Sequence, residues 1–456
     1  MSGFVIRHAD LVNEGRIVRG DLHVVDGQIA EVVDADGDEQ WITSLPPDTA
    51  VVDGRGCYLI PGVIDTHVHF RDGGDSGHPA GDFSSESRAA LAGGVTSVID
   101  MPNTNPPTVG LKELEVKELT ASRCSVVNYG FMLGVTNSNI DTLLAVEPER
   151  YAALKLFLGS STGNMLVDDN AVLDRLFGES RKVIVAHCEA EGVVQRNLAN
   201  LRAEFAGTDG ETAALHPKVR NVEACFLSTY HAVERARRYK THLHIAHLST
   251  ATELSLLSNQ SLDEKTITAE VTPNHLWFDD RDYAAMGNLI KCNPSIKSND
   301  DRLALWAALE DGLIDTIATD HAPHLLGEKQ KRYFEAPSGI PSIQHSLQMM
   351  LEPLMNDAQH EMVSHWLPLL VEKMCHNPAR IFHIGRRGYL RPGYHADLVL
   401  VRPCPEGQTV QRSDLRYKCG WSPIEGMTFH SRIERVWVNG NDCGEACAAQ
   451  ALQYRQ

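Results

Sequence analysis

The sequence has 456 residues, of which 43% are hydrophobic, and a formal net charge of −18 at pH 7. A chain of this length accommodates one large domain and one smaller domain, with enough apolar residues for a core that needs no disulfides. Its negative charge opposes binding to nucleic acids and to anionic membrane surfaces. No apolar stretch approaches the roughly 20 residues of a membrane-spanning helix, so we expect no nucleic-acid partner and no membrane partner.

The 10 cysteines are scattered, and only Cys443 and Cys447 lie close together in the sequence. The N-terminal residues MSGFVIRHADLV alternate in polarity like a β-strand and do not resemble a signal peptide. The sequence therefore predicts a cytoplasmic protein with free thiols in a reducing environment.

Both ends of the chain are rich in β-strand patterns. Residues 1–57 alternate apolar and polar residues with turn-forming residues between the runs, which is typical of short antiparallel strands. The same pattern returns at residues 395–403 and 432–440. We therefore expect a small β-sandwich domain to which both termini contribute.

Short apolar segments alternate with helical stretches through the middle of the chain. Eight such segments predict an α/β fold of the (β/α)8 or TIM-barrel type, in which active-site residues lie at the C-terminal ends of the strands. The amphipathic stretches 111–122 and 219–239 are expected to be outer helices. The strands are expected at residues 63–70, 96–101, 126–133, 154–158, 183–187, 243–247, 267–271 and 315–320.

These patterns divide the chain into two expected domains. The barrel is expected to cover residues 59–384. The β-sandwich is expected to combine residues 1–58 with residues 385–456, the latter including a C-terminal tail.

The first barrel strand carries a pattern of polar residues at its end. Side chains on a strand alternate between two faces, so His67, His69 and Arg71 project to the same side. Two neutral imidazoles can bind a transition metal. A guanidinium cannot bind a metal, but it can bind an anion. A metal beside an anion-binding arginine indicates hydrolysis or cyclisation of an acidic substrate. The alternative for this segment alone is a pair of packed core histidines.

Lys155 stands alone among apolar neighbours in the segment ALKLFLG. Burial of an ammonium group is unfavourable and lowers its pKa, so that the neutral amine becomes nucleophilic. Such an amine can take up carbon dioxide and form a carbamate, an anionic ligand able to bridge two metals. The alternative is a lysine that extends to the surface at the strand end.

Three further strand ends carry candidate ligands. His187 ends the fifth strand, and Asp320 ends the eighth, where a carboxylate can bind a metal and accept a proton from water. In the segment THLHIAHLST, His247 lies nearest the strand end and is the expected ligand, whereas His244 is expected to be packed.

Six candidate ligands therefore fall at predicted strand ends. Single histidines at such positions are common, but this many on separate strands in barrel order favours a site for two metal ions over accidental packing. The predicted metal ligands are His67, His69, Lys155, His187, His247 and Asp320.

The order of these ligands resembles that of the amidohydrolase superfamily, and within it the cyclic amidohydrolases. Two stretches resemble the signatures of dihydroorotases, namely DTHVHFRDG at residues 65–73 and ATDHAPHLLGEK at residues 318–329. The resemblance extends over essentially the whole chain. Supporting matches are DMPNTNPP at 100–107, KCNPSIKS at 291–298, SGIPSIQHSL at 338–347 and WSPIEGMTF at 421–429.

The resemblance implies a reaction and a cofactor. Dihydroorotases interconvert N-carbamoyl-L-aspartate and L-dihydroorotate, a step of pyrimidine synthesis, by means of a metal-bridging hydroxide. It implies two zinc ions, one held by His67, His69 and Asp320 and the other by His187 and His247, with carboxylated Lys155 as the bridge. It also implies a small anionic substrate and, because family members are commonly dimers or tetramers, a homo-oligomer.

The resemblance further implies roles at the substrate. Asp320 is expected to be the catalytic residue that accepts the proton of the attacking hydroxide and passes it to the leaving ring nitrogen. Arg71 is expected to bind the substrate carboxylate, together with Asn103 and His324. Asn293 is expected to border the substrate ring.

Two alternatives remain open from the sequence. Allantoinases and dihydropyrimidinases share the metal ligands, but their substrates lack the carboxylate that Arg71 and His324 are expected to bind. The other alternative is a non-catalytic homologue, which the presence of all six ligand candidates disfavours.

Overall fold

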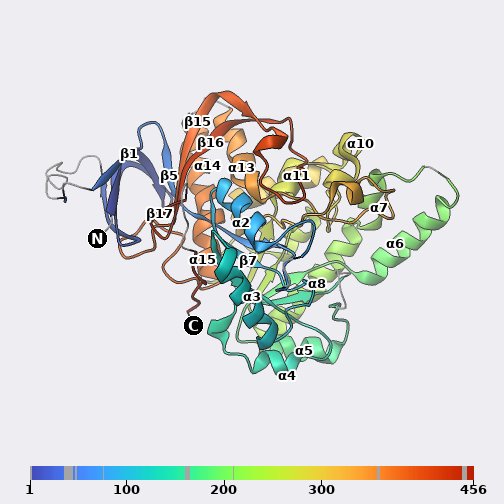
Figure 1. The fold of residues 1–456 in the computed structure, drawn as a ribbon. Helices are drawn as coiled ribbons and strands as arrows, with labels where there is room; N and C mark the ends of the chain where they lie inside the picture. Colours follow the sequence, from blue (N-terminus) through green and yellow to red (C-terminus); the bar gives the residue numbers. More distant parts are fainter. Residues whose placement is uncertain are drawn as a thin grey trace.

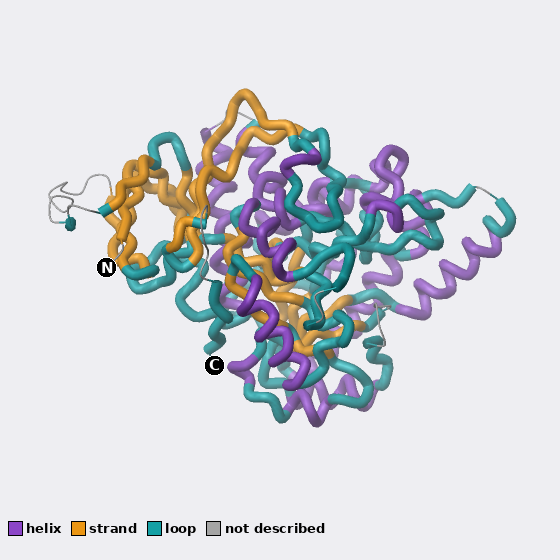
Figure 2. Tube along the Cα trace, in the orientation of Figure 1, coloured by secondary structure: helices purple, strands orange, loops and turns teal. Residues whose placement is uncertain are grey.

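The computed structural model describes residues 3–34, 45–46, 49–74, 77–159, 165–208, 210–356, 360–443 and 449–455. A central group of strands is surrounded by helices, and a smaller β-rich part lies to one side, beside the N-terminus (Figures 1 and 2). Within the described part of the chain, no helix is both long and apolar enough to cross a lipid bilayer.

The central strands form two parallel sheets, β6-β7-β8 and β9 to β14 in order. The backbone amide of Ala152 donates to the carbonyl of Phe131 (2.8 Å) at one seam, and that of His69 donates to the carbonyl of His321 (2.8 Å) at the other. The two sheets thus close into the expected barrel, which confirms the predicted fold class. The strands are β6 Val63–Val68, β7 Val95–Asp100, β8 Asn128–Phe131, β9 Leu133–Gly134, β10 Leu154–Phe157, β11 Ile184–His187, β12 Leu243–Ile245, β13 Ile267–Val271 and β14 Thr316–Ile317.

Helices cover the outside of the barrel, and the two expected from the sequence correspond to α3 and α8. Helix α8 begins at the Asn221 cap, whose side chain accepts a hydrogen bond from the amide of Ala224, and it ends where Lys240 adopts a left-handed conformation. The main helices are α2 Phe83–Ala92, α3 Leu111–Cys124, α5 Asn170–Glu179, α6 Glu191–Glu204, α8 Val222–Tyr239, α11 Asn299–Glu310, α13 Ser346–Met355 and α14 His360–Val371. The shorter ones are α4 Ile140–Leu144, α7 His216–Val219, α9 Pro273–Trp277, α10 Tyr283–Met286, α12 Leu326–Lys329 and α15 Asn377–Ile381.

Both chain ends build one eight-stranded sheet, as the β-sandwich expectation requires. Strand β5 joins the two ends, because it pairs in parallel with β1 and antiparallel with β15. This part has a hydrophobic core of its own, which includes Leu22, Leu400 and Trp437. Its strands are β1 Gly3–Asn13, β2 Arg16–Val25, β3 Gln28–Asp34, β4 Ala50–Asp53, β5 Tyr58–Pro61, β15 Leu398–Thr409, β16 Thr428–Val438 and β17 Asn441–Asp442.

The last described segment, residues 449–455, lies against the barrel. The amide of Leu452 donates to the carbonyl of Tyr129 (2.8 Å), and the amide of Tyr129 donates to the carbonyl of Gln450 (3.1 Å). The segment therefore pairs with an edge of β8, which the sequence did not predict.

The cysteines differ in part from the expectation of free thiols. Eight of the described cysteines are free, and six of these are buried. Cys443, however, is disulfide-bonded, which contradicts the expectation for that residue.

A buried polar network joins the barrel to the terminal sheet. Asp397 is 3% exposed and forms an ion pair with the equally buried Arg387. Its carboxylate also accepts hydrogen bonds from the amide of Asn439 (2.8 Å) and from the side chain of Asn128 in β8 (3.2 Å). Because these buried charges have no access to water, each is stabilised only by its partners in the protein, and loss of one leaves the other uncompensated.

The substitution Asp397→Ala tests this junction. It leaves the Arg387 guanidinium buried without a counter-charge, and we expect the free energy of unfolding to fall by about 3–5 kcal/mol. Urea denaturation followed by circular dichroism measures the change. In the matched control Asp53→Ala, which removes a solvent-exposed partner of Arg55, the denaturation midpoint should not move. A midpoint that is equally unchanged in Asp397→Ala would contradict the role of the network.

Candidate active site

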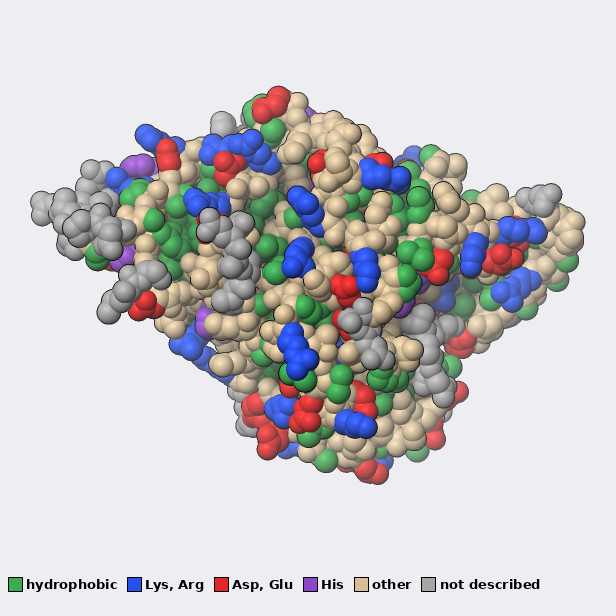
Figure 3. All heavy atoms as spheres, in the orientation of Figure 1, with side chains coloured by type: hydrophobic (Ala, Val, Ile, Leu, Met, Phe, Trp, Pro, Cys, Tyr) green, Lys and Arg blue, Asp and Glu red, His purple; other side chains and the backbone are tan. Residues whose placement is uncertain are grey.

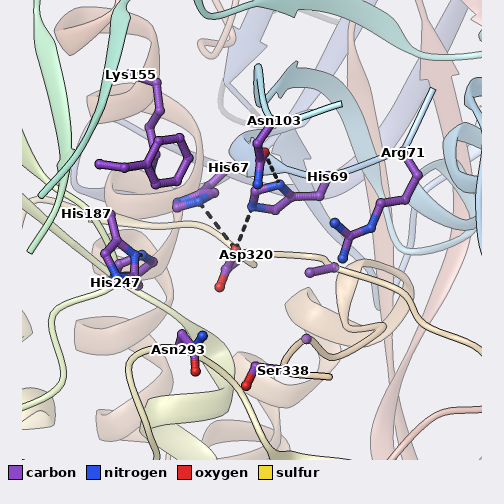
Figure 4. Close-up of a pocket in the computed structure, with 13 residues that line it drawn as sticks. His67, His69, Arg71, Asn103, Lys155, His187, His247, Asn293, Asp320 and Ser338 are labelled. Atoms are coloured by element: carbon purple, nitrogen blue, oxygen red, sulfur yellow. Dashed lines mark hydrogen bonds and ion pairs between the residues drawn. The ribbon is translucent and has the colours of Figure 1, made fainter. Parts of the chain in front are cut away.

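A cavity opens at the C-terminal end of the barrel strands, where the predicted ligands converge (Figure 4). All six predicted ligands line it, as do Arg71, Asn103 and Asn293, whereas His324 does not. Its lining residues are His67, His69, Arg71, Asn103, Lys155, Phe157, His187, His247, Asn293, Asp320, Ala322, Ser338 and Gly339.

His67, His69 and Asp320 form the tightest group of candidate ligands. Oδ1 of Asp320 lies 3.3 Å from Nε2 of His67 and 3.0 Å from Nε2 of His69, and Figure 4 shows both contacts as dashed lines. One ligand atom from each residue lies within 4.8 Å of the other two. Burial tends to raise the pKa of Asp320, but the neighbouring histidines, His67 first, outweigh it and hold the pKa below its usual range. The carboxylate is therefore anionic, as a metal ligand must be.

The outer nitrogens of these two histidines have their own partners. Nδ1 of His67 lies 2.7 Å from a carboxylate oxygen of Glu270, and Nδ1 of His69 lies 2.8 Å from Oδ1 of Asn103. Both partners are hydrogen-bond acceptors, so Nδ1 of each histidine donates to them, and Nε2 of each faces Asp320. This pattern of an inner nitrogen for the metal and an outer nitrogen for an oxygen is typical of metal-binding histidines.

His187 and His247 form a second pair of candidate ligands. Nδ1 of His187 lies 2.9 Å from Nε2 of His247, while the outer Nε2 of His187 lies 2.9 Å from Glu189. Burial lowers the pKa of both imidazoles, that of His247 strongly, so both are neutral near pH 7. Nδ1 of His247 has no hydrogen-bond partner among the described residues. Two neutral imidazoles that face each other at this distance provide lone pairs for a metal.

Lys155 is enclosed in the barrel at the second position of β10. Its Nζ atom is buried and has no hydrogen-bond partner among the described residues, although it lies 5.2 Å from the centre of the Phe157 ring. Burial lowers the pKa of Lys155 to about 8, against the opposing effect of Glu270. A buried amine without a partner is unfavourable as it stands, and it is suited to modification by carbon dioxide.

His67, His69 and Asp320 could hold one metal ion, and His187 and His247 offer further nitrogen donors in the same cavity. Lys155 lines the same cavity and supplies the only candidate among the described lining residues for a carbamate between them. Within this cavity, Nζ of Lys155 and Nδ1 of His247 are buried and form no hydrogen bond with a described residue.

Arg71 occupies one side of the cavity (Figure 4). Its Nε donates to the carbonyl of Pro323 (3.3 Å), and its Nη2 lies 3.1 Å from Nε2 of His324. Burial, followed by the charge of Arg71, lowers the pKa of His324 to about 2, so this imidazole is neutral. Its Nε2 also lies 3.0 Å from the carbonyl of Ser338. His324 thus lies beside Arg71 but is not among the residues that line the cavity, and its contact with the substrate stays a prediction.

Asn293 lines the opposite part of the cavity, and its Oδ1 lies 3.1 Å from Nε2 of His216. Sequence reasoning missed four lining residues. Phe157 follows Lys155 with strand alternation and so was recoverable, whereas Ala322, Ser338 and Gly339 lie in loops whose course the sequence pattern does not reveal. Glu189 and Glu270 are fully buried beside His187 and His67.

His244 and His275, two further histidines near strand ends, do not line the cavity. Nδ1 of His244 lies 2.8 Å from the hydroxyl of Thr268. His275 lies between the hydroxyl of Thr272 (2.8 Å) and the carbonyl of Pro294 (3.1 Å). Both are hydrogen-bonded within the protein.

Three site residues have a backbone conformation that non-glycine residues rarely adopt. The φ angles are 68° for Arg71, 38° for His247 and 48° for Asp320. Such conformations are unfavourable and are concentrated at functional sites, where the surrounding structure enforces them. Each directs a side chain into the cavity immediately after a strand ends.

Comparisons with known proteins agree with this geometry. The amidohydrolase family pattern matches residues 58–442. The dihydroorotase of Halobacterium salinarum is 32% identical over 413 residues, which cover 90% of this chain and 92% of that protein. The dihydroorotase of Latilactobacillus sakei is 30% identical over 445 residues, which cover 96% and 97%.

Solved structures share the fold. An L-hydantoinase (dihydropyrimidinase) from Arthrobacter aurescens is 26% identical, with a TM-score of 0.89 and coverage of 99% of this chain and 100% of that chain. The family match spans most of the sequence and both groups of candidate ligands. The chain therefore belongs to the amidohydrolase family, in the branch of cyclic amidohydrolases that includes the dihydroorotases.

Proposed function

We propose that this protein is a dihydroorotase that interconverts N-carbamoyl-L-aspartate and L-dihydroorotate. The observation that carries the proposal is the position of Arg71, whose guanidinium borders the same cavity as the candidate metal ligands. Dihydroorotate carries a carboxylate, and a guanidinium binds a carboxylate through two parallel hydrogen bonds. The names of the most similar curated relatives support the same substrate.

The proposal includes two zinc ions held by the two histidine groups. Lys155 would join them after its neutral amine adds to carbon dioxide, which forms a carbamate and releases one proton. When bound, the metal ions would supply an activated water molecule and polarise the amide carbonyl.

The side chains of the protein would carry out the remaining steps. Asp320 would accept a proton from the attacking water and deliver it to the ring nitrogen as the carbon–nitrogen bond breaks. Arg71 would hold the substrate carboxylate, with Asn103 and His324 beside it, and Asn293 would border the ring. In ring closure Asp320 would return the proton along the same path.

A hydantoinase or dihydropyrimidinase activity is the second candidate. The structural similarity to the Arthrobacter aurescens L-hydantoinase supports it. These substrates share the cyclic amide but lack the carboxylate of dihydroorotate, so they would leave Arg71 without a partner. An allantoinase is disfavoured for the same reason.

Turnover of several cyclic amides separates these activities. We expect the purified zinc-loaded protein to hydrolyse L-dihydroorotate and to close N-carbamoyl-L-aspartate, with kcat/KM at least about 100-fold above that for dihydrouracil, hydantoin or allantoin. Absorbance of the ring amide measures each rate. Turnover confined to substrates without a carboxylate would refute the proposed function in favour of the second candidate.

The substitution Arg71→Gln tests the contact with the carboxylate. Because hydrogen bonds to charged groups contribute about 1.5–3 kcal/mol each, we expect kcat/KM for dihydroorotate to fall by roughly 100-fold or more. Arg71→Lys keeps the positive charge but cannot form two parallel hydrogen bonds to the carboxylate. Its kcat/KM for dihydroorotate should therefore lie between those of the original protein and Arg71→Gln. Any residual activity on dihydrouracil should be unaffected, and an equal loss on both substrates would argue against carboxylate recognition.

The substitution Lys155→Ala tests the bridge. We expect loss of bound zinc and a decrease in activity of more than about 100-fold. This decrease is larger than that typical of substitutions at residues that only hydrogen-bond to metal ligands. Added short carboxylic acids should partly restore activity, because they can occupy the position of the carbamate. Elemental analysis and mass spectrometry of the native protein provide the check. Full zinc content and full activity in Lys155→Ala would contradict the bridge.

A further inference from the structure

A second cavity lies at the opposite end of the barrel, where the strands begin. His242 immediately precedes strand β12, while Lys182 and Ala152 lie just before β11 and β10. The cavity has a volume of about 310 Å³, within the range of small-molecule sites. Its lining residues are Pro148, Ala152, Ser180, Arg181, Lys182, Val183, Lys240, Thr241, His242, His383 and Arg455.

The charged residues that line this cavity are all basic. Arg181, Lys182, Lys240 and Arg455 carry positive charges, and none of the described lining residues is acidic. In a chain with a net charge of −18, such a local excess of positive charge is unexpected. On the face in Figure 3, by contrast, basic and acidic side chains are interspersed.

Lys182 is the central observation. The residue is only 8% exposed, and its ammonium group lies 4.9 Å from the centre of the Tyr454 ring and 5.8 Å from that of Tyr151. No described residue accepts a hydrogen bond from it or forms an ion pair with it. Burial lowers the pKa of Lys182 to about 8, with a smaller opposing effect from Glu149. The side chain is thus largely withdrawn from water, while its ammonium group borders the cavity without an anionic partner and is available to an anion.

The other cations of the cavity are also not neutralised. Arg181 donates to the carbonyl of Leu144 (3.2 Å), which carries no formal charge. Neither Lys240 nor Arg455 forms an ion pair with a described carboxylate. The cavity therefore combines several unneutralised cations with apolar walls formed by Pro148 and Val183.

We propose that this cavity binds a small organic molecule that bears a phosphate group. A phosphate ester carries nearly two negative charges on one group, which matches a buried lysine flanked by arginines. The apolar walls suit the organic part of such a molecule. The site is separate from the candidate active site, so the proposal does not depend on the proposed dihydroorotase activity.

Calorimetric titration of the zinc-loaded protein tests the site, with inorganic phosphate and phenyl phosphate as probes and phenol as the uncharged control. We expect phenyl phosphate to bind more tightly than inorganic phosphate, and phenol not to bind. Succinate, whose two charges are separated, should bind more weakly than phenyl phosphate. Absence of binding by both phosphate probes would refute the proposal.

The variants Lys182→Met and Arg455→Gln locate the binding. We expect Lys182→Met to weaken phenyl phosphate binding by about 10–100-fold, the effect of one charge-assisted hydrogen bond. Arg455→Gln, at an exposed position, should weaken it less. Arg123→Gln, an exposed arginine on α3 away from the cavity, is the matched control and should bind like the original protein. Unaltered binding in Lys182→Met would place the probe elsewhere and overturn the proposal.

Melting temperature distinguishes a binding role from a structural one. If Lys182 serves a ligand, Lys182→Met should melt at the same temperature as the original protein or higher, because it replaces a largely buried lysine that has no anionic partner with an uncharged side chain. Added phenyl phosphate should then raise the melting temperature of the original protein and not that of the variant. A marked decrease in the melting temperature of Lys182→Met would assign Lys182 a structural role and refute the proposal.

Discussion

The buried carboxylate of Glu270 is the contact on which the arrangement of the candidate site depends. It accepts the Nδ1 proton of His67 at 2.7 Å and a hydrogen bond from the backbone amide of His247 at 3.2 Å. One side chain on β13 thus orients a histidine of the first candidate metal site and fixes the backbone at a histidine of the second. Burial opposes ionisation of Glu270, but His67 and His244 outweigh it and hold its pKa well below the usual range. An anion enclosed in this way has few other positions available, and so the histidines are held in place before any metal binds.

The barrel makes such enclosure possible because it brings strands from distant parts of the sequence to one opening. Parallel strands end at the same rim, so each needs to contribute only one or two polar residues while the rest of the strand packs against the outer helices. The same geometry withdraws Lys155 from water and favours the neutral amine. The chemistry of the lysine is therefore a consequence of its position on an apolar strand.

Much of this organisation could be predicted from the sequence. Eight apolar segments define the barrel, and strand alternation places His67, His69 and Arg71 together. The sequence could not reveal the left-handed conformations at Arg71, His247 and Asp320, because these are imposed by surrounding contacts against the local preference of the residues. Nor could it reveal Ala322, Ser338 and Gly339 as lining residues, because these lie in loops. The expectation of free thiols failed at Cys443, where sequence spacing does not determine the redox state.

The pairing of residues 449–455 with β8 has a consequence for the order of events during protein synthesis. Strand β8 is synthesised long before the segment that covers its edge, because the two are far apart in the sequence. Until then, the nascent barrel wall exposes backbone groups at that edge that can pair with other unfinished chains. The pairing of residues 449–455 with β8 therefore protects this edge against intermolecular association.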